Sequence, residues 1–139
     1  MTQVLILCTA NSARSQMAEG LLRDITHQQG QSMDVYSAGA FPSTVNPLAI
    51  EAMHEIGLDI SQQRSKSLTE FLNQPFDYVI TVCDNAAESC PIFPGPAQRI
   101  HWSLPDPAAV KGSHEQQLES FRQVRNDLEG YFQDWVRTL

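Results

Sequence analysis

Short apolar runs alternate with amphipathic stretches along the chain, a pattern typical of a protein that alternates strands and helices. The clearest run is Val4-Leu5-Ile6-Leu7, which is continuous, as in a strand buried on both faces. Polar and glycine-containing turns separate the segments. The predicted strands are residues 2–7, 33–39, 77–82 and 99–102, and the predicted helices are residues 15–28, 47–56 and 113–139, with a short helical turn at 68–72.

Two of the predicted helices carry clear signals of their ends or faces. Asn46 can cap a helix whose first residue is Pro47, and Gly57 can end it. The last helix begins near Ser113 and carries one stripe at helical spacing, which we interpret as core rather than as a cofactor site. The stripe consists of Leu118, Phe121, Val124, Arg125, Leu128, Phe132 and Val136.

Strands that alternate with helices predict a parallel sheet with right-handed crossovers. We therefore expect an α/β fold, with residues 1–139 forming a single domain around a four-stranded parallel sheet flanked by helices. Ligands of such sheets bind beyond the carboxyl ends of the strands. Because Cys8, Cys83 and Asp106 each follow a predicted strand, the topology should bring them to one edge of the sheet.

Cys8 ends the first strand and opens a loop that leads directly into the first helix. Small residues let such a loop curl until its backbone N–H groups point inward, beside the N-terminus of the helix. The result is an anion cradle with a nucleophile at its floor. The loop residues after the cysteine are Thr9, Ala10, Asn11, Ser12, Ala13, Arg14 and Ser15.

The residue types of this loop suit covalent chemistry on a tetrahedral oxyanion. A helix N-terminus and a nearby arginine favour the thiolate form of Cys8, which is the nucleophilic form. Arg14 can hold two oxygens of the anion at once. Ser15 can donate a hydrogen bond to the sulfur, and Asn11 can hold the loop through side-chain bonds to the backbone. The alternative is a buried thiol without chemistry beside a surface arginine. We favour the oxyanion site, because strand, loop, arginine and helix follow one another in the order that such a site needs.

Cys83 and Cys90 form a second pair of candidate residues, in a polar segment that ends at Pro91. If residues 84–90 formed a helix, the two cysteines would lie roughly 10 Å apart along its axis. A disulfide requires Cα atoms within about 7 Å, so the two could pair only if the segment unwinds, which its polar residues and Pro91 make easy. The alternative is two half-buried cysteines without chemistry, and Cys8 at the same edge favours a reactive pair.

Asp106 is the candidate general acid. It lies between Pro105 and Pro107, which stiffen the loop and fix where the carboxylate points. A carboxyl that is partly desolvated beside a thiolate can stay protonated and act as an acid; the alternative is an ordinary turn aspartate. The histidines are weaker candidates, with His27, His54 and His114 expected to be solvated and His101 to be packed on the fourth strand.

The amino-acid composition argues against several classes of partner and site. The formal net charge of −7 argues against nucleic acid or an acidic membrane as partner, and 42% hydrophobic residues suffice for a core. No apolar run approaches a membrane span, and no basic segment precedes a long apolar stretch near residue 1, so we expect a cytoplasmic protein. Three cysteines indicate catalysis or redox exchange in a reducing compartment, and no set of four metal ligands is apparent, so no metal site is expected.

Residues 8–19 resemble the phosphate loop of the low-molecular-weight protein tyrosine phosphatases and are still more similar to the arsenate reductases built on that fold. The loop pattern alone marks only the superfamily. Cys83 and Cys90 at this spacing point to the thioredoxin-coupled reductases, and Ala108 and Ala109 stand where the phosphatases usually carry tyrosines. The similarity covers nearly the whole chain, including residues 37–39, 46–53, 81–83, 90–91 and 101–108.

The resemblance implies a mechanism for these residues. Cys8 would attack arsenic, Arg14 and the loop amides would hold the oxygens of arsenate, and Asp106 would protonate the leaving oxygen. Cys83 would then attack Cys8 and release arsenite, and Cys90 would attack Cys83 to leave a Cys83–Cys90 disulfide. Thioredoxin or another external thiol would reduce that disulfide, with no bound cofactor. A phosphatase that uses only Cys8, Arg14 and Asp106 stays open as an alternative, as does a redox-sensing or phosphocysteine protein.

The resemblance also suggests a support structure beside the loop. Some members of the family bind potassium through residues that match Asn11, Ser15, Glu19 and Ser37, together with an acidic residue of a following loop. That following loop reads Arg64-Ser65-Lys66 in this chain, so the Lys66 ammonium would replace the cation. The alternative is that Lys66 is a solvated surface lysine.

Overall fold

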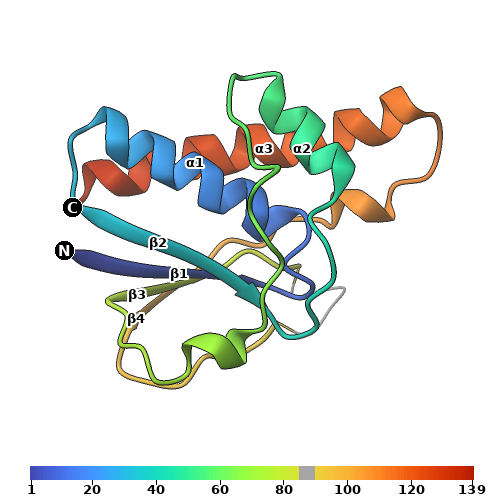
Figure 1. The fold of residues 1–139 in the computed structure, drawn as a ribbon. Coiled ribbons are helices and arrows are strands. Elements are labelled where there is room, and N and C mark those ends of the chain that lie inside the picture. The colour runs from blue at the N-terminus through green and yellow to red at the C-terminus, as the bar shows by residue number, and fades with distance from the viewer. Residues whose placement is uncertain (85–89) are drawn as a thin grey trace.

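The computed structural model of the chain describes residues 1–84 and 90–139. In these residues the predicted alternation of strands and helices is confirmed (Figure 1). The elements are β1 (Thr2–Cys8), α1 (Arg14–Gln28), β2 (Met33–Gly39), α2 (Pro47–His54), the 3-10 helix η1 (Leu68–Phe71), β3 (Tyr78–Thr81), β4 (Gln98–His101), the 3-10 helix η2 (Pro107–Ala109) and α3 (His114–Arg137). The helix considered for residues 84–90 falls largely outside the described residues.

The four strands form one parallel sheet in the order β2-β1-β3-β4, as expected. β1 therefore lies between β2 and β3. Its last residue, Cys8, is paired with Gly39 of β2, and Leu7 is paired with Thr81 of β3. The carboxyl ends of three strands thus meet around Cys8.

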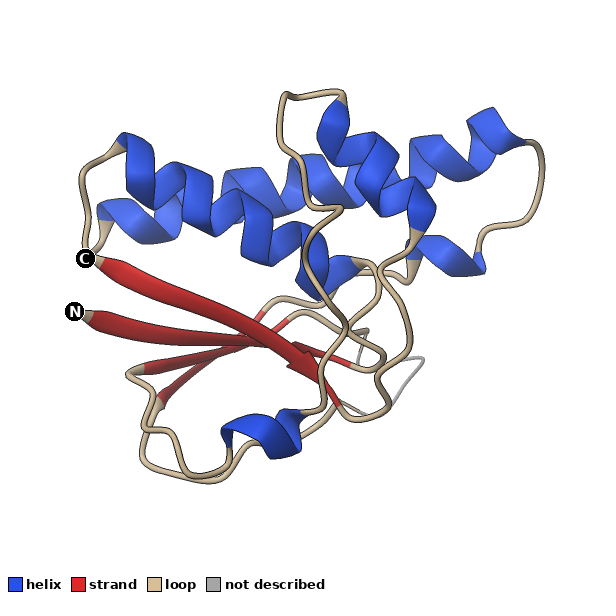
Figure 2. Cartoon of the chain, viewed as in Figure 1, coloured by secondary structure: helices blue, strands red, loops and turns tan. Residues whose placement is uncertain are grey.

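The helices lie on one face of the sheet. Figure 2 shows α1, α2 and α3 together above the strands, while η1 and the loops lie on the opposite side. Two cores result, because successive residues of β1 point to opposite faces: Val4 and Ile6 pack under the helices, and Leu5 and Leu7 pack under η1 and its loops. The continuous apolar run of β1 is therefore buried on both faces, as predicted.

The predicted signals of α2 are present, but the helix is shorter than expected. The Asn46 side chain caps the helix by accepting a hydrogen bond from the Leu48 N–H at 2.8 Å. The helix ends at His54, and Gly57 closes the following turn in the left-handed region at φ +80°. Ile56, which we expected on the buried face, therefore lies beyond the helix and is 39% exposed.

The long helix α3 begins with a capping box in which Ser113 and Gln116 bond each other's backbone N–H groups. All seven residues of the predicted stripe are buried, and α3 packs on α1 and α2. Within residues 1–84 and 90–139, no helix combines the length and the apolarity needed to cross a bilayer.

A network of charges joins the end of α2 to α3. Arg122 donates to both oxygens of Glu55, at 2.7 Å from Nη2 to Oε2, and Arg125 donates to Glu55 Oε1 at 2.9 Å and to the Ala52 carbonyl at 2.7 Å. The hydrogen bonds from Arg122, with those from Arg125, lower the pKa of the Glu55 carboxyl from 4.5 to about 2. Because the pKa is depressed in the folded state, the stability that the network contributes is present above pH 4.5 and is lost as the pH falls towards 2.

We expect Glu55→Gln to lower the free energy of unfolding at pH 7 by about 1 kcal/mol, the upper end for exposed ion pairs. The variant should also lose part of the stability difference that the wild type shows between pH 5 and pH 3. Urea unfolding followed by circular dichroism measures both effects, with Asp127→Asn as a control for removing one exposed acid from α3. Identical pH dependence in Glu55→Gln and the wild type would contradict the assignment.

Candidate active site

Cys8 lies at the end of β1, directly under the loop that leads to α1. Its side chain is 2% exposed, and its Sγ is hydrogen-bonded to Ser15 Oγ at 2.7 Å. Ser15 is the second residue of α1 and is itself fully buried. The contact that we predicted between the hydroxyl and the sulfur is therefore present, and it holds the thiol beside the first turn of the helix.

Asn11 organises this loop. It is the one residue other than glycine with a positive φ among the described residues, at 48°. Its Nδ2 donates to Ser15 Oγ at 2.7 Å and to Ser37 Oγ at 2.9 Å, while its Oδ1 accepts from the Lys66 backbone N–H at 2.8 Å. The side chain thus ties the loop to α1, to β2 and to the segment around residue 66, which is more than the local backbone bonds that we expected.

Gln16 is a buried support that the sequence reasoning did not identify. Its Nε2 donates to Asn11 Oδ1 at 2.9 Å and to the Arg64 carbonyl at 2.9 Å, and Gln63 Nε2 donates to Gln16 Oε1 at 2.7 Å. The signal available in the sequence was a polar residue immediately after Arg14-Ser15, on a helix turn that faces the loop. Gln16 joins the loop to residues 63 and 64, so these segments hold one another in place.

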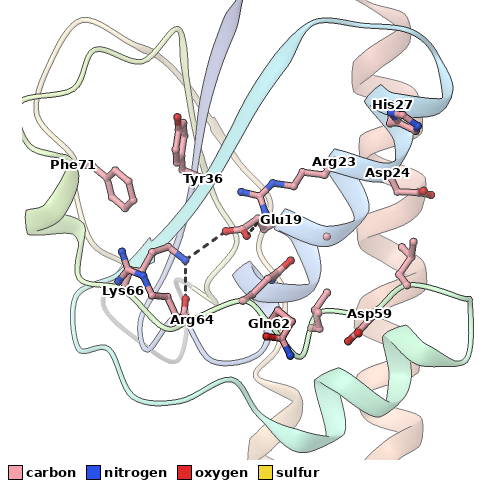
Figure 3. Close-up of a pocket in the computed structure, with 14 residues that line it drawn as sticks. Glu19, Arg23, Asp24, His27, Tyr36, Asp59, Gln62, Arg64, Lys66 and Phe71 are labelled. Carbon is pink, nitrogen blue, oxygen red and sulfur yellow. Dashed lines mark hydrogen bonds and ion pairs between the residues drawn. The ribbon is translucent and has the colours of Figure 1, made fainter.

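A buried carboxylate, Glu19, lies one turn of α1 beyond Ser15 and faces the buried ammonium of Lys66. Glu19 is 2% exposed and accepts from Ser37 Oγ at 2.6 Å, and Arg23 Nη1 lies 2.8 Å from its other oxygen. Lys66 Nζ lies 3.6 Å from Glu19 Oε1 and donates to the Arg64 carbonyl at 2.7 Å (Figure 3). The alternative of a solvated Lys66 is wrong, since the residue is only 8% exposed, and this burial lowers the pKa of its ammonium.

These contacts form a continuous chain from Lys66 to the thiol. The ion pair with Glu19 is followed by the hydrogen bonds of Ser37, Asn11 and Ser15, and the last of these reaches Cys8. Glu19 and Lys66 also line a cavity of about 860 Å³ between α1, β2 and residues 58–66. The ion pair at the outer end of the chain of contacts therefore forms part of the wall of this cavity.

A separate cavity of about 220 Å³ opens over the thiol. It is lined by Cys8, Arg14 and Asp106 among others, so the structure brings these three predicted residues together. Arg14 is 4% exposed and donates from Nη1 to the Leu104 carbonyl at 3.0 Å, which fixes its guanidinium beside the loop before Asp106. The remaining lining side chains are small: Thr9, Ala10, Ser12, Ala13, Ser43 and Ala108.

Asp106 differs from expectation in its environment. The residue is exposed, and its Oδ1 accepts the Ala108 N–H at 3.0 Å and so caps η2. The expected partial desolvation of this carboxyl is therefore wrong. Asp106 caps a turn, as the alternative stated, and it also lines the cavity over the thiol. His101 also differs, because it is exposed rather than packed, with its Nδ1 2.6 Å from Thr81 Oγ1.

Cys83 and Cys90 form a disulfide, with their Cα atoms 5.9 Å apart. This distance is within the range that a disulfide requires and below the separation across a regular helix. Cys83 directly follows Val82, whose N–H donates to the Leu7 carbonyl at 2.9 Å, so the disulfide begins next to the strand that carries Cys8. Cys83 is fully buried and Cys90 is half-buried, and neither lines the cavity over the thiol.

Residues 3–139 match the family of low molecular weight phosphotyrosine protein phosphatases. The chain belongs to this family. Among similar proteins, an arsenate reductase of Halalkalibacterium halodurans is 45% identical over 125 residues, covering 90% of this chain and 88% of that protein. An arsenate reductase solved in a phosphate-binding state is 33% identical, with a TM-score of 0.81 over 99% of this chain and 98% of that one.

The name of a third relative includes its reductant. The thioredoxin-dependent arsenate reductase of Corynebacterium glutamicum is 32% identical, with a TM-score of 0.62 over 96% of this chain and 62% of that one. The resemblance to the phosphatase-like arsenate reductases is thereby confirmed at the level of family and fold.

Gly39 lets the loop that follows Cys8 lie directly on β2. A Cβ atom added at this position would be 2.7 Å from the Thr9 carbonyl oxygen and 2.8 Å from the Asn11 nitrogen. Both atoms belong to the loop backbone, which cannot move aside without disturbing the contacts of Asn11. The absence of a side chain at residue 39 is therefore a condition for the geometry of the loop.

We expect Gly39→Ala to lower the free energy of unfolding by about 1–3 kcal/mol, as overpacking does, and to weaken phosphate binding at the loop. Gly130→Ala is the matched control, because a Cβ there meets nothing within 4 Å in α3 and should raise stability by about 0.5–1 kcal/mol. Urea unfolding and calorimetric phosphate titration measure the two effects. Unchanged phosphate affinity in Gly39→Ala would show that the loop tolerates the contact.

Proposed function

We propose that the chain reduces arsenate to arsenite, with Cys8 as the nucleophile and with Cys83 and Cys90 as the thiols that supply the electrons. The observation that carries the proposal is a disulfide between Cys83 and Cys90 that starts beside a buried Cys8 in an anion cradle. A phosphatase needs a nucleophile, an arginine and an acid, and it gives the disulfide no role. The similarity to named arsenate reductases supports the same choice.

In the first step, the Cys8 thiolate attacks arsenic and an oxygen leaves. The Cys8 sulfur is positioned for this attack by its hydrogen bond with Ser15 Oγ, in the first turn of α1. Arg14 holds two of the remaining oxygens, and its own position is fixed by the Leu104 carbonyl. Asp106 gives a proton to the leaving oxygen from the wall of the cavity.

In the second stage, the thiols transfer two electrons. Cys83 attacks the Cys8 sulfur, the sulfur–arsenic bond breaks, and its electron pair leaves with arsenic as arsenite. Cys90 then attacks Cys83 and releases the Cys8 thiolate, which leaves the Cys83–Cys90 disulfide found in the structure. The order is supported by burial, because Cys83 adjoins the strand of Cys8 while Cys90 lies nearer to solvent.

An external dithiol completes the cycle. The relative from Corynebacterium glutamicum depends on thioredoxin, and we extend this reductant to the present chain, with no bound cofactor. The reducing cytoplasm suits three cysteines that work as thiols.

The cavity over the thiol supports a small oxyanion rather than a phosphotyrosine. Ala108 lines this cavity and Ala109 follows it, so neither residue offers an aromatic ring that could pack on a substrate ring. Phosphate and sulfate are accordingly expected as competitive analogues. Residual hydrolysis of small phosphate esters is consistent with the same three residues.

We expect wild-type protein to couple arsenate reduction to oxidation of thioredoxin, whereas Cys8→Ser should form no arsenic adduct. Cys83→Ser should complete one covalent step at Cys8 and stop. Cys90→Ser should stall with a Cys8–Cys83 disulfide. Arsenite release over time and peptide mapping without reductant measure these states.

Hydrolysis of p-nitrophenyl phosphate, assayed alongside, separates the two enzyme classes. Efficient ester hydrolysis without thioredoxin oxidation by arsenate would overturn the reductase in favour of a phosphatase. A Cys8–Cys90 link in place of Cys8–Cys83 would keep the reductase and reverse the roles of the two thiols.

Lys66 is assigned the role of a tethered cation beside the loop. Glu19 is buried next to the residues that hold the thiol, and its charge has to be balanced for an oxyanion to bind nearby. Arg23 and Lys66 supply that balance at 2.8 and 3.6 Å. The ammonium therefore takes the place that a free monovalent cation fills in some relatives.

We expect the wild-type melting temperature to be the same in sodium and in potassium at equal ionic strength. Lys66→Gln should lower the free energy of unfolding by about 1–3 kcal/mol, the usual loss for a buried hydrogen bond to a charge, and potassium should partly restore it by binding to the folded state. Lys111→Gln, which changes the other lysine of the chain at an exposed position, is the control. A potassium-specific stabilisation of the wild type would overturn the tethered-cation role.

A further inference from the structure

Residues 9–13 form the loop above the thiol, and each of their carbonyl groups accepts a hydrogen bond from outside that loop. The donors, in the order of the carbonyls, are the Phe41 N–H at 2.9 Å, Ser65 Oγ at 3.0 Å, Gln16 Nε2 at 3.0 Å, the Asn46 N–H at 2.9 Å and the Met17 N–H at 2.9 Å. All five donors lie outside the lining of the cavity over the thiol. The carbonyl oxygens are therefore directed away from the place that an oxyanion would occupy.

This arrangement decides which backbone groups face the cavity. Across a trans peptide bond, the carbonyl of one residue and the N–H of the next residue point in opposite directions. A carbonyl that is held on the outside therefore turns the following N–H inward, and Ala10, Ser12 and Ala13 line the cavity. Because an N–H group stabilises an oxyanion and a carbonyl oxygen repels it, the outer donors set the electrostatics of the site.

Ser65 joins two walls of this cavity through one hydroxyl group. Its Oγ donates to the Ala10 carbonyl at 3.0 Å and accepts from the Ser43 N–H at 2.9 Å. Ala10 and Ser43 both line the cavity, the first on the loop and the second on the segment after β2. The Ser65 hydroxyl thus fixes the direction of one peptide group and also the separation between two sides of the opening.

Ser65 is itself held in place by its two neighbours in the chain. The Arg64 carbonyl accepts from Gln16 Nε2 at 2.9 Å, and the Lys66 N–H donates to Asn11 Oδ1 at 2.8 Å. The backbone is therefore bonded to α1 on one side of Ser65 and to the loop on the other side. A side chain that is supported in this way can hold the Ala10 carbonyl without rearrangement when an anion binds.

We propose that Ser65 is a positioning residue of the oxyanion site and acts through Ala10 and Ser43 without touching the substrate. Its hydroxyl keeps the Ala10 carbonyl turned away from the bound anion and keeps the segment at Ser43 against the loop. The inference rests on the proposed function only for the identity of the substrate as arsenate. Phosphate meets the same N–H groups, so it can serve as a probe that undergoes no reduction.

The test compares three variants in one short segment. Ser65→Ala removes the hydroxyl, and Ser65→Thr keeps it. Ser67→Ala is the matched control, because the Ser67 hydroxyl caps η1 by accepting the Thr69 N–H at 3.2 Å, so its loss lowers stability in the same segment. Calorimetric titration should show phosphate binding about tenfold weaker in Ser65→Ala, as for one lost hydrogen bond to a charged group. Ser65→Thr and Ser67→Ala should bind phosphate as the wild type does.

Arsenate turnover separates positioning from a general loss of stability. The N–H groups of the loop hold the oxygens in bound arsenate as well as in the transition state, so Ser65→Ala should raise the KM for arsenate about tenfold and change kcat less. Urea unfolding, followed by circular dichroism, measures the stability that each variant has lost. Ser67→Ala should lose stability without a change in KM.

A further measurement needs no variant. In amide NMR spectra of the wild type, phosphate should shift the N–H protons of residues 10–13, which the outer donors turn inward. The N–H protons of Phe41 and Asn46, which are bonded to the outer side of the loop, should shift much less. Absence of any shift at residues 10–13 while phosphate binds would contradict the positioning role.

The remaining outcomes separate this inference from the proposed function. Wild-type phosphate affinity in Ser65→Ala would overturn the positioning role, and so would equal weakening in Ser67→Ala, since the segment would then act only through its stability. If the wild type releases no arsenite with thioredoxin while Ser65→Ala still binds phosphate more weakly, the proposed function is overturned and the positioning role is supported.

Discussion

The geometry of the loop between Cys8 and α1 depends on a buried asparagine in a conformation that few residues adopt. A positive φ at a residue other than glycine is uncommon, and asparagine is among the side chains that tolerate it best. At Asn11 the turn reverses the chain after β1 and places the amide group between Ser15 and Ser37. The bonds that the amide makes to α1, to β2 and to Lys66 offset the strain and leave none of its polar atoms unpaired. A side chain without both a donor and an acceptor could not make these bonds.

The parallel sheet sets the positions of the segments that surround the loop. The pairing of Cys8 with Gly39 and of Leu7 with Thr81 fixes where β2 and β3 end relative to the thiol. Gly39 then allows the loop to touch β2, and the segment after β3 starts the disulfide beside β1. The positions of the reactive groups thus follow from strand register, which depends on the apolar pattern of the strands rather than on the reactive residues.

The sequence was sufficient for those features that depend on local pattern. Strand β1, the cap at Asn46 and the buried stripe of α3 follow from periodicity and capping chemistry, and the loop from Cys8 to Ser15 follows from residue type and spacing. The features that were missed depend on contacts between distant segments. Gln16 acts through Arg64 and Gln63, and periodicity says nothing about such partners.

The exposure of side chains around the carboxyl ends of the strands was the least predictable property. Asp106 was expected to be partly desolvated, and His101 to be packed, but both lie at the exposed rim beyond or at the end of β4. A strand of four residues that pairs on one side only leaves its side chains largely open, and its edge position is a property of topology rather than of composition. Lys66 shows the converse, since a residue typical of surfaces is buried by contacts with Glu19 and the Arg64 carbonyl.

The way in which Asn11 joins residues far apart in the chain also bears on how the protein folds. Its partners lie in α1, in β2 and in the segment at Lys66, and Arg14 is held by the Leu104 carbonyl, 90 residues further along the chain. Contacts between such distant residues form late, because the entropy of closing the intervening loops is lost before they contribute. Cys8 therefore lacks the surrounding loop contacts until these distant segments have come together. The shape of the loop above Cys8 should consequently require the complete native fold, so that a local change at residue 66 or 104 would be felt at residue 8.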